Sequence, residues 1–199
     1  MTVGIILTIL GICTSILGIS IIFKNRQIQP EIKVAEPFTQ QLPDTKSEKE
    51  KGDDFEKYVV QKFSKSYFSV LEWTGDKFVN GTYAQSNRHP DFTLKFKMKD
   101  VDVDFSVECK YRSEYYKNGV EWCSDKQMEF YKSFAEAKKR PVFVVIGLGG
   151  KPDSPEELFI VPLSEMTNTF VHKSFLLAYK KDNFKESNLF YDYQSGRLK

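Results

Sequence analysis

The residues best suited to chemistry are two carboxylates and one lysine near the middle of the chain. Glu108 and Lys110 flank Cys109, and side chains two positions apart on a strand point to the same side. Asp91 directly follows Pro90 in an earlier stretch. Carboxylates hold a hard cation such as Mg²⁺ through oxygen, and a neighbouring lysine can direct a water or offset phosphate charge. The combination suits hydrolysis of a phosphate ester.

Two stretches of alternating residues are predicted to position these side chains. In residues 91–99 and 102–112, apolar side chains alternate with polar ones, as in strands with one buried face. The short polar link around Asp100 predicts an antiparallel hairpin, in which Asp91 and Glu108 can approach the same ion. Cys109 would then turn into the core, away from the polar face of the strand.

The remaining elements predict a mixed sheet with helices on its faces. Apolar residues at four-residue spacing predict a helix over residues 53–66. A second helix is expected at 124–139, where Ser124 and Gln127 fit a capping box. Strands are expected at 68–73, 142–148 and 158–162, the second covered on both faces. A loop is expected at 75–89, and one or two helices beyond Ser164.

Several motifs are similar to those of a known superfamily. Pro90-Asp91 followed by Glu108-x-Lys110 resembles the PD-(D/E)XK motif of restriction endonuclease-like enzymes. Gly52-x-x-Phe55-Glu56 resembles the first-helix signature of Mrr-like and resolvase-type members. Gln127-x-x-x-Tyr131 is similar to the helix motif that follows the catalytic lysine in RecB-like members. The resemblance covers about residues 51–163 and implies a three-layer α-β-α fold around a mixed central sheet.

The same resemblance implies roles for individual residues. Asp91, Glu108 and the backbone carbonyl of Cys109 would bind Mg²⁺ or Mn²⁺, and Lys110 would handle the attacking water. Glu56 would orient groups or help a second ion. Gln127 would support the lysine or the phosphate. Nucleic-acid contacts are expected from basic and aromatic side chains, namely Lys95, Lys97, Arg112 and Tyr131, with Lys99 and Arg140 as further candidates.

The implied activity is that of a metal-dependent endo- or exodeoxyribonuclease, a DNA phosphodiester hydrolase. Restriction, phage defence or DNA repair would be its setting, and a homodimer is compatible with the family. The composition alone does not indicate a nucleic-acid binder, because 29 basic residues face 27 acidic ones and the formal net charge is +2. Three cysteines indicate neither a disulfide framework nor a zinc site of paired cysteines.

Each candidate also has an ordinary structural interpretation. Glu108 and Lys110 would fit a solvent-facing salt bridge. The helix dipole explains an acidic residue such as Glu56 in a first turn, a capping box explains Gln127, and helical spacing explains Tyr131 as core. Lysines that protect an edge strand from aggregation are the alternative for three strand residues, Lys95, Lys97 and Lys99.

Two other functions remain open at this point. The domain could be a catalytically inactive nuclease-fold module that binds nucleic acid or protein at the membrane. It could also be a membrane-associated adaptor with an unrelated mixed α/β fold, in which Asp91 and Glu108 would lie far apart.

The first residues predict a membrane anchor. Residues 3–23 carry no charge and are long enough to cross a hydrocarbon core, which needs about 20 helical residues. A cleaved signal peptide is less suitable, because no basic residue precedes this stretch and no small-residue cleavage pattern follows. Basic residues only on the C-terminal side predict a single-pass protein of the inner or plasma membrane with a cytoplasmic domain. The predicted organisation is an anchor at 1–23, a flexible linker at 24–50 and the nuclease-like domain at 51–199.

Overall fold

The structure, a computed structural model, describes residues 46–74, 78–79, 82–83 and 88–199 of the 199-residue chain. The predicted anchor at 1–23 and nearly all of the predicted linker lie outside these residues. Within the described part of the chain, no helix combines the length and the apolar character that a membrane span requires. One compact unit comprises Thr45–Lys199.

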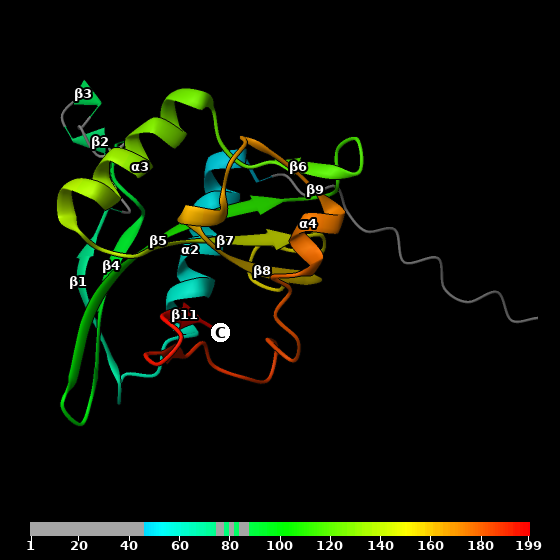
Figure 1. Ribbon diagram of the computed structural model, residues 1–199. Coiled ribbons are helices and arrows are strands. Elements are labelled where there is room, and N and C mark those ends of the chain that lie inside the picture. Colours follow the sequence, from blue (N-terminus) through cyan, green and yellow to red (C-terminus); the bar gives the residue numbers. More distant parts are fainter. Residues whose placement is uncertain (1–45, 75–77, 80–81, 84–87) are drawn as a thin grey trace, which may run out of the picture. The chain divides into compact units, whose positions relative to one another are not determined.

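A five-stranded mixed sheet lies at the centre of this unit (Figure 1). In spatial order the strands are β1 (Phe68–Trp73), β4 (Phe92–Met98), β5 (Val101–Arg112), β7 (Val142–Leu148) and β8 (Glu157–Pro162). Strands β5 and β7 run parallel, and every other pair of neighbours is antiparallel. The antiparallel β4–β5 hairpin and the mixed sheet confirm the predictions from the sequence.

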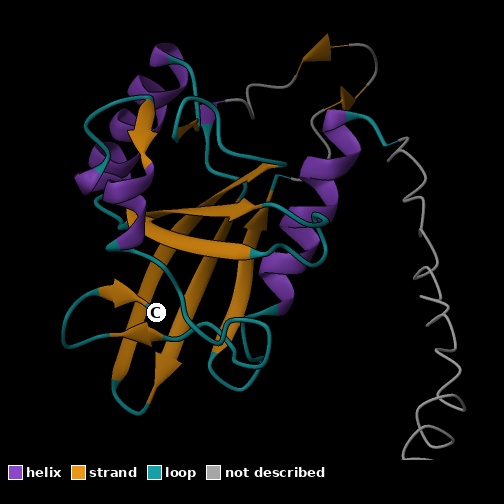
Figure 2. Cartoon of the chain, turned by 90° about the vertical axis from the view of Figure 1, so that its right-hand side faces the viewer, coloured by secondary structure: helices purple, strands orange, loops and turns teal. Residues whose placement is uncertain are grey.

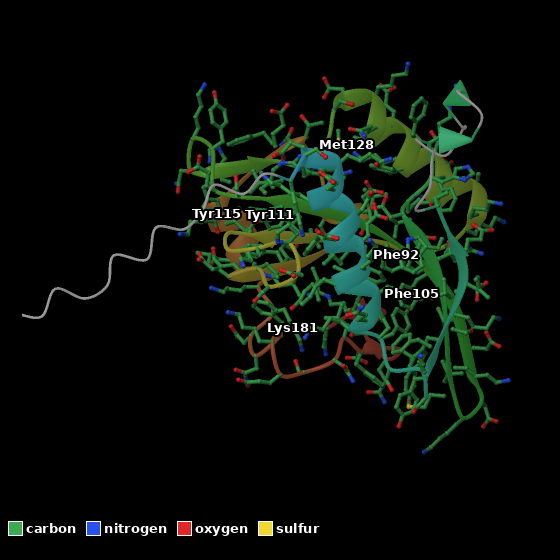
Figure 3. The ribbon with its side chains drawn as sticks, turned by 180° about the vertical axis from the view of Figure 1, so that it is seen from behind. Phe92, Phe105, Tyr111, Tyr115, Met128 and Lys181 are labelled. Atoms are coloured by element: carbon green, nitrogen blue, oxygen red, sulfur yellow. The ribbon has the colours of Figure 1, made fainter. Side chains whose placement is uncertain are left out.

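Helices α2 (Glu48–Gln61) and α3 (Asp125–Lys138) cover opposite faces of the sheet (Figure 2). Alternate residues of β7 belong to different cores, since successive side chains of a strand point to opposite faces. Phe143 packs in the core that contains Phe55 of α2, whereas Val144 packs in the core that contains Tyr131 of α3. Phe92 and Phe105 lie on the α2 side (Figure 3). The fold therefore has three layers.

The polar face of the central hairpin differs from the prediction. A strand with one solvated face was expected, but Thr93, Ser106 and Glu108 are all buried. Their face lies beneath α3, because the Tyr131 hydroxyl of that helix reaches Glu108. Strand β7 is buried along its whole length, which confirms the prediction of a strand covered on both faces.

The first helix begins earlier than predicted. It spans Glu48–Gln61 rather than 53–66, because Ser47 caps it. The Ser47 Oγ accepts a hydrogen bond from the Glu50 N–H at 3.3 Å, and a Glu50 carboxylate oxygen accepts one from the Ser47 N–H at 2.8 Å. This reciprocal capping box satisfies two helix-end donors. The domain boundary predicted at residue 51 consequently falls inside α2.

Short elements complete the unit. A small hairpin, β2 (Phe78–Val79) with β3 (Thr82–Tyr83), occupies part of the predicted loop. After residue 163 the prediction of one or two helices is only partly right, because small strands share this region with a short helix. The remaining elements are β6 (Gly119–Glu121), η2 (Leu163–Glu165), β9 (Phe170–His172), α4 (Lys173–Leu177), β10 (Tyr191–Asp192) and β11 (Arg197–Leu198).

Close approach of α2 to the sheet depends on Gly147 of β7. A Cβ atom at this position would lie 2.3 Å from the Phe55 ring. We expect Gly147→Ala to lower the free energy of unfolding by about 1–3 kcal/mol, since the core has no room for the methyl group. Gly52→Ala is the matched control, because a Cβ there meets nothing within 4 Å. It should raise the free energy by up to about 1 kcal/mol through helix propensity.

Urea unfolding of the two glycine variants measures both effects. Equal free energies of unfolding for Gly147→Ala and the wild type would show that α2 does not pack closely against this strand.

Candidate active site

The hairpin register brings the two predicted carboxylates together. Phe92 pairs with Val107 across β4 and β5, and one further step of this register places Asp91 opposite Glu108. The Asp91 Oδ2 accepts a hydrogen bond from the Cys109 N–H at 2.7 Å. Both carboxylates are buried, with 2% of Asp91 and 1% of Glu108 exposed. The adaptor alternative requires these residues to lie far apart, which the structure contradicts.

The end of β1 fixes the backbone of Asp91. The Thr74 N–H donates to the Asp91 carbonyl oxygen at 2.8 Å. The Thr74 hydroxyl lies 2.7 Å from the same oxygen and 2.8 Å from the Pro90 carbonyl oxygen. Pro90 has no N–H to offer a neighbouring strand, so it suits the position just before β4. The aspartate is thus anchored through its backbone by one strand and through its side chain by another.

Glu108 is held by one of its two oxygens. Its Oε1 accepts a hydrogen bond from the Tyr131 hydroxyl at 2.6 Å and forms an ion pair with the Lys110 ammonium. Its Oε2 is buried and has no hydrogen-bond partner. A buried anionic oxygen without a partner is costly, because it has lost water and gained nothing in return. This oxygen is therefore the natural place for a cation.

The charge states of these groups follow from their surroundings. Burial raises the pKa of Glu108 to about 6, and the charge of Asp91 adds to the effect. Burial alone would lower the pKa of Lys110, but the charges of Glu108 and Asp91 outweigh it and raise that pKa. Burial, followed by the charge of Glu108, raises the pKa of the Tyr131 hydroxyl. At neutral pH Glu108 is mainly ionised, Lys110 is protonated and Tyr131 is a neutral donor.

Tyr131 has a place that differs from its predicted role. The prediction of a nucleic-acid contact does not fit a side chain that is only 3% exposed. Its ring stacks on Trp122 at 6.1 Å between centroids, and the Lys110 Nζ lies 5.9 Å from its centroid. The structure instead places the Tyr131 hydroxyl against Glu108, where it donates a hydrogen bond to Oε1. The resemblance of Gln127-x-x-x-Tyr131 to a family motif associated Tyr131 with the site, but no sequence signal indicated its partner.

Two cavities meet at Lys110. One has a volume of about 290 Å³ and is lined by Asp91, Cys109, Lys110 and, from α2, Glu56. The other has a volume of about 480 Å³ and includes Gln127 in its wall. Glu56 therefore lies on the Asp91 side of the lysine and Gln127 on the other side. The amide oxygen of Gln127 accepts a hydrogen bond from the Ser124 N–H at 3.1 Å, which confirms the predicted capping box.

The lysines of β4 do not gather around the site. The Lys95 Nζ pairs with Asp102 at 2.8 Å and with Asp104 at 3.3 Å. Lys97 is six residues beyond Asp91, about 20 Å away along an extended strand. Lys99 lies beyond the end of β4, with a φ of 54°. Lys99 is therefore not a strand residue, contrary to the prediction. The edge-strand explanation is wrong for β4, which lies between β1 and β5.

The two arginines are occupied by structural contacts. The Arg112 guanidinium donates to the carbonyl oxygens of Glu121 at 2.7 Å and Tyr111 at 2.8 Å, and so ties β6 to the end of β5. Arg140 lies 3.4 Å from an Asp104 oxygen. Their nucleic-acid contacts stay predictions, and any such contact by Arg112 would have to share donors with these carbonyls.

The donor set fits a hard divalent cation. Within the described ranges, no three side chains of His, Cys, Asp or Glu form a group that could hold a metal ion. Mg²⁺ commonly takes only one or two carboxylates and completes its shell with water and phosphate oxygens. Asp91, the unpartnered Oε2 of Glu108 and the nearby Cys109 backbone match that smaller requirement.

Comparison with known proteins gives a likeness to solved structures. No protein-family model matches the chain, and no curated protein sequence matches it. Among solved structures, the chain is similar to Hjc from Archaeoglobus fulgidus, a Holliday junction resolvase from an archaeal hyperthermophile. The two share 17% sequence identity over 64% of this chain and 93% of that chain, with a TM-score of 0.45.

The raised pKa of Glu108 predicts a pH-dependent stability. The ordinary value is 4.5 and the folded value is about 6, so the folded state binds this proton more tightly than the unfolded chain. Protonation thus stabilises the metal-free fold fully below about pH 4.5, and this contribution is lost as the pH rises through about 6. Relative to Glu108→Gln, which cannot titrate, the wild type should gain about 2 kcal/mol of unfolding free energy between about pH 7 and 4.5.

Denaturant unfolding in EDTA at both pH values measures this difference. Glu129→Gln, a change at an exposed position of α3, is the matched control and should show no comparable change. If the difference in unfolding free energy between the wild type and Glu108→Gln is the same at both pH values, Glu108 is better solvated than its burial indicates.

Proposed function

We propose that the chain is a divalent-metal-dependent nuclease of the PD-(D/E)XK kind that hydrolyses phosphodiester bonds of DNA. The observation that carries the proposal is the buried, unpartnered Oε2 of Glu108 beside Asp91 and Lys110. An inactive scaffold gains nothing from such an oxygen, since it lowers stability without a compensating contact. A nuclease needs it to hold the cation.

Asp91, Glu108 and the Cys109 carbonyl would hold Mg²⁺ or Mn²⁺. When bound, the cation polarises a phosphoryl oxygen and lowers the pKa of a coordinated water. Tyr131 and Lys110 both engage Oε1 of Glu108, which keeps the carboxylate in one orientation with its other oxygen available. Because Lys110 is protonated, it acts as a hydrogen-bond donor to water or phosphate and offsets negative charge, rather than as a base.

The first turns of α2 supply further groups to the same cavity. Lys49, Lys51 and Glu56 line the cavity that contains Asp91. Lys51 is paired with Glu48 at 3.0 Å, and Asp53 also lines this cavity, so the excess positive charge that a phosphate requires would come from the bound cation. Glu56 would orient the groups around the cation.

The cellular setting remains part of the proposal. We propose a single-pass anchor at residues 3–23 in the inner or plasma membrane, with the nuclease domain in the cytoplasm. The anchor would keep the enzyme where incoming or damaged DNA is handled, in restriction, phage defence or repair. A homodimer would suit cleavage of both strands of a duplex.

A nuclease assay tests the proposal. The full-length chain, purified in a mild detergent, should cut plasmid or linear DNA with Mg²⁺ or Mn²⁺ and be inactive in EDTA. Asp91→Asn, Glu108→Gln and Lys110→Ala should each lower the rate about 100-fold or more, because each removes a group that acts on the reacting phosphate. Lys65→Ala, an exposed lysine after α2, is the control and should keep wild-type activity.

Cation binding separates a nuclease from an inactive module. Titration calorimetry with Mn²⁺ should show binding that weakens about 10- to 100-fold in Asp91→Asn and Glu108→Gln, since each loses a charged ligand. Glu114→Gln, at an exposed position beyond β5, should bind Mn²⁺ as the wild type does. Wild-type protein that neither binds Mn²⁺ nor cuts DNA would contradict the proposal, whereas DNA binding without cutting would favour the inactive module.

A further inference from the structure

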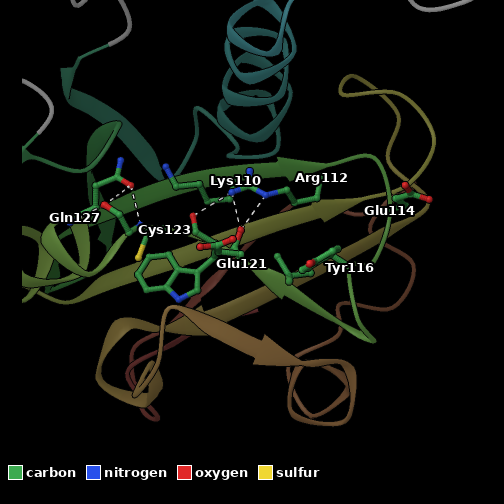
Figure 4. A pocket seen from close by; sticks show the side chains of 10 residues that line it. Lys110, Arg112, Glu114, Tyr116, Glu121, Cys123 and Gln127 are labelled. Carbon is green, nitrogen blue, oxygen red and sulfur yellow. Dashed lines mark hydrogen bonds between the residues drawn. The ribbon is translucent and has the colours of Figure 1, made fainter.

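The cavity on the far side of Lys110 has no part in the proposed chemistry. Its volume of about 480 Å³ lies in the range of small-molecule pockets. Figure 4 shows Gln127 at one end and Tyr116 at the other, with Lys110 and Arg112 between them. Both of these basic residues also line the cavity that contains Asp91. Whatever enters this second cavity therefore lies next to the proposed scissile phosphate.

The charges around this cavity are already matched. Lys110 is paired with Glu108, and Arg112 donates to backbone carbonyl oxygens. Two acidic residues, Glu114 and Glu121, also line the cavity. With two basic and two acidic residues the wall has no net formal charge, whereas a phosphate requires an excess of positive charge. The cavity favours a neutral ligand instead.

Aromatic and apolar residues form another part of the wall. Trp122 is fully buried, and its indole N–H donates to the Asn168 carbonyl oxygen at 2.9 Å. Val120 lies beside it, also buried. Tyr116 is 59% exposed and so offers an accessible aromatic surface, whereas Trp122 and Val120 support the wall from behind. Such a wall suits a flat ligand with polar edges.

A rigid turn holds Tyr116 at the rim. The Tyr116 N–H donates to the Gly119 carbonyl oxygen and the Gly119 N–H donates to the Tyr116 carbonyl oxygen, both at 2.9 Å. Lys117 and Asn118, between them, have φ values of 45° and 58°, as in a tight hairpin turn. A tyrosine on such a turn is preorganised for stacking and loses little entropy on binding.

We propose that this cavity takes an unpaired nucleobase from the nucleotide next to the cleaved phosphate, with Tyr116 stacking on it. The inference rests on the proposed nuclease function and names its substrate class: DNA that is single-stranded at the point of cleavage. A base inside a duplex is stacked and paired, and entering the cavity would require extrusion at a cost of a few kcal/mol. An unpaired base avoids that cost, and stacking on an aromatic side chain is sequence-tolerant.

Binding in the absence of cleavage tests this substrate class. The probe is a short oligodeoxynucleotide with one 2-aminopurine, used single-stranded or in a blunt duplex, with the full-length chain in detergent and EDTA. Anisotropy should show at least about ten-fold tighter binding of the single strand, and 2-aminopurine fluorescence should change only for that strand. Tyr116→Ala should weaken single-strand binding about ten-fold. Tyr193→Ala, a similarly exposed tyrosine, is the matched control and should have no effect.

A second variant guards against a misfolded Tyr116→Ala. Glu121 is exposed at the cavity wall, and Glu121→Trp should occlude the space and abolish the fluorescence change with an unaltered circular dichroism spectrum. Equal binding of duplex and single strand, no binding of either, or single-strand binding unaffected by both variants would overturn the inference. Single-strand binding that needs Tyr116, without cleavage in Mg²⁺ or Mn²⁺, would support the inference and reject the nuclease function. Cleavage of duplex DNA at the same rate by the wild type and by both variants would support the nuclease function and reject the inference.

Discussion

The site depends on one buried carboxylate that is only half satisfied. Glu108 lies in the interior beneath α3, where an isolated charge would be expensive. Tyr131 and Lys110 both engage Oε1, so the side chain has one orientation and its Oε2 is left without a partner. The fold thus maintains an unfavourable arrangement at one atom. Strain of this kind persists only where the surrounding structure is strong enough to impose it and a ligand relieves it.

The surrounding structure provides that strength from both faces of the sheet. On one face, α3 is fixed by its capping box and brings the Tyr131 hydroxyl to Glu108. On the other face, Phe55 of α2 rests over Gly147, and this close contact carries the first turns of α2 to the cavity beside Asp91. The hairpin between these layers sets the register of the two carboxylates. A shift of one residue in that register would turn Glu108 to the opposite face.

The position of Lys110 between two cavities separates two kinds of recognition. On the Asp91 side the walls are charged and suit a cation and a phosphate. On the Gln127 side basic and acidic residues are equal in number and Tyr116 is exposed at the rim, which suits a neutral ring. Under the two proposals, the phosphate and the base of one nucleotide would therefore have separate surroundings at the same strand end. Neither cavity requires the chain as a whole to be basic, which agrees with its formal net charge of +2.

Local sequence patterns were sufficient for the central strands of the sheet and for the approach of Asp91 to Glu108. Alternation predicted the β4–β5 hairpin, and the hairpin by itself places Asp91 opposite Glu108. The capping box at Ser124 predicted the start of α3. These features depend on neighbours in the chain or on one tight connection, so the sequence determines them without knowledge of the rest of the fold.

The environment of each residue was decided only by the tertiary structure. Alternation cannot tell a solvated polar face from one that a helix covers, so the burial of Glu108 and its bond to Tyr131 were not predictable. Two further contacts also join separate segments of the chain. Arg112 donates hydrogen bonds to the backbone of β6, and Lys95 pairs with acidic residues of the adjacent strand. The sequence by itself determined which groups could act. Packing decided which of these groups are charged, which are accessible and which hold the others in place. The reason is that pKa values and solvent access depend on burial and on neighbours distant in the chain.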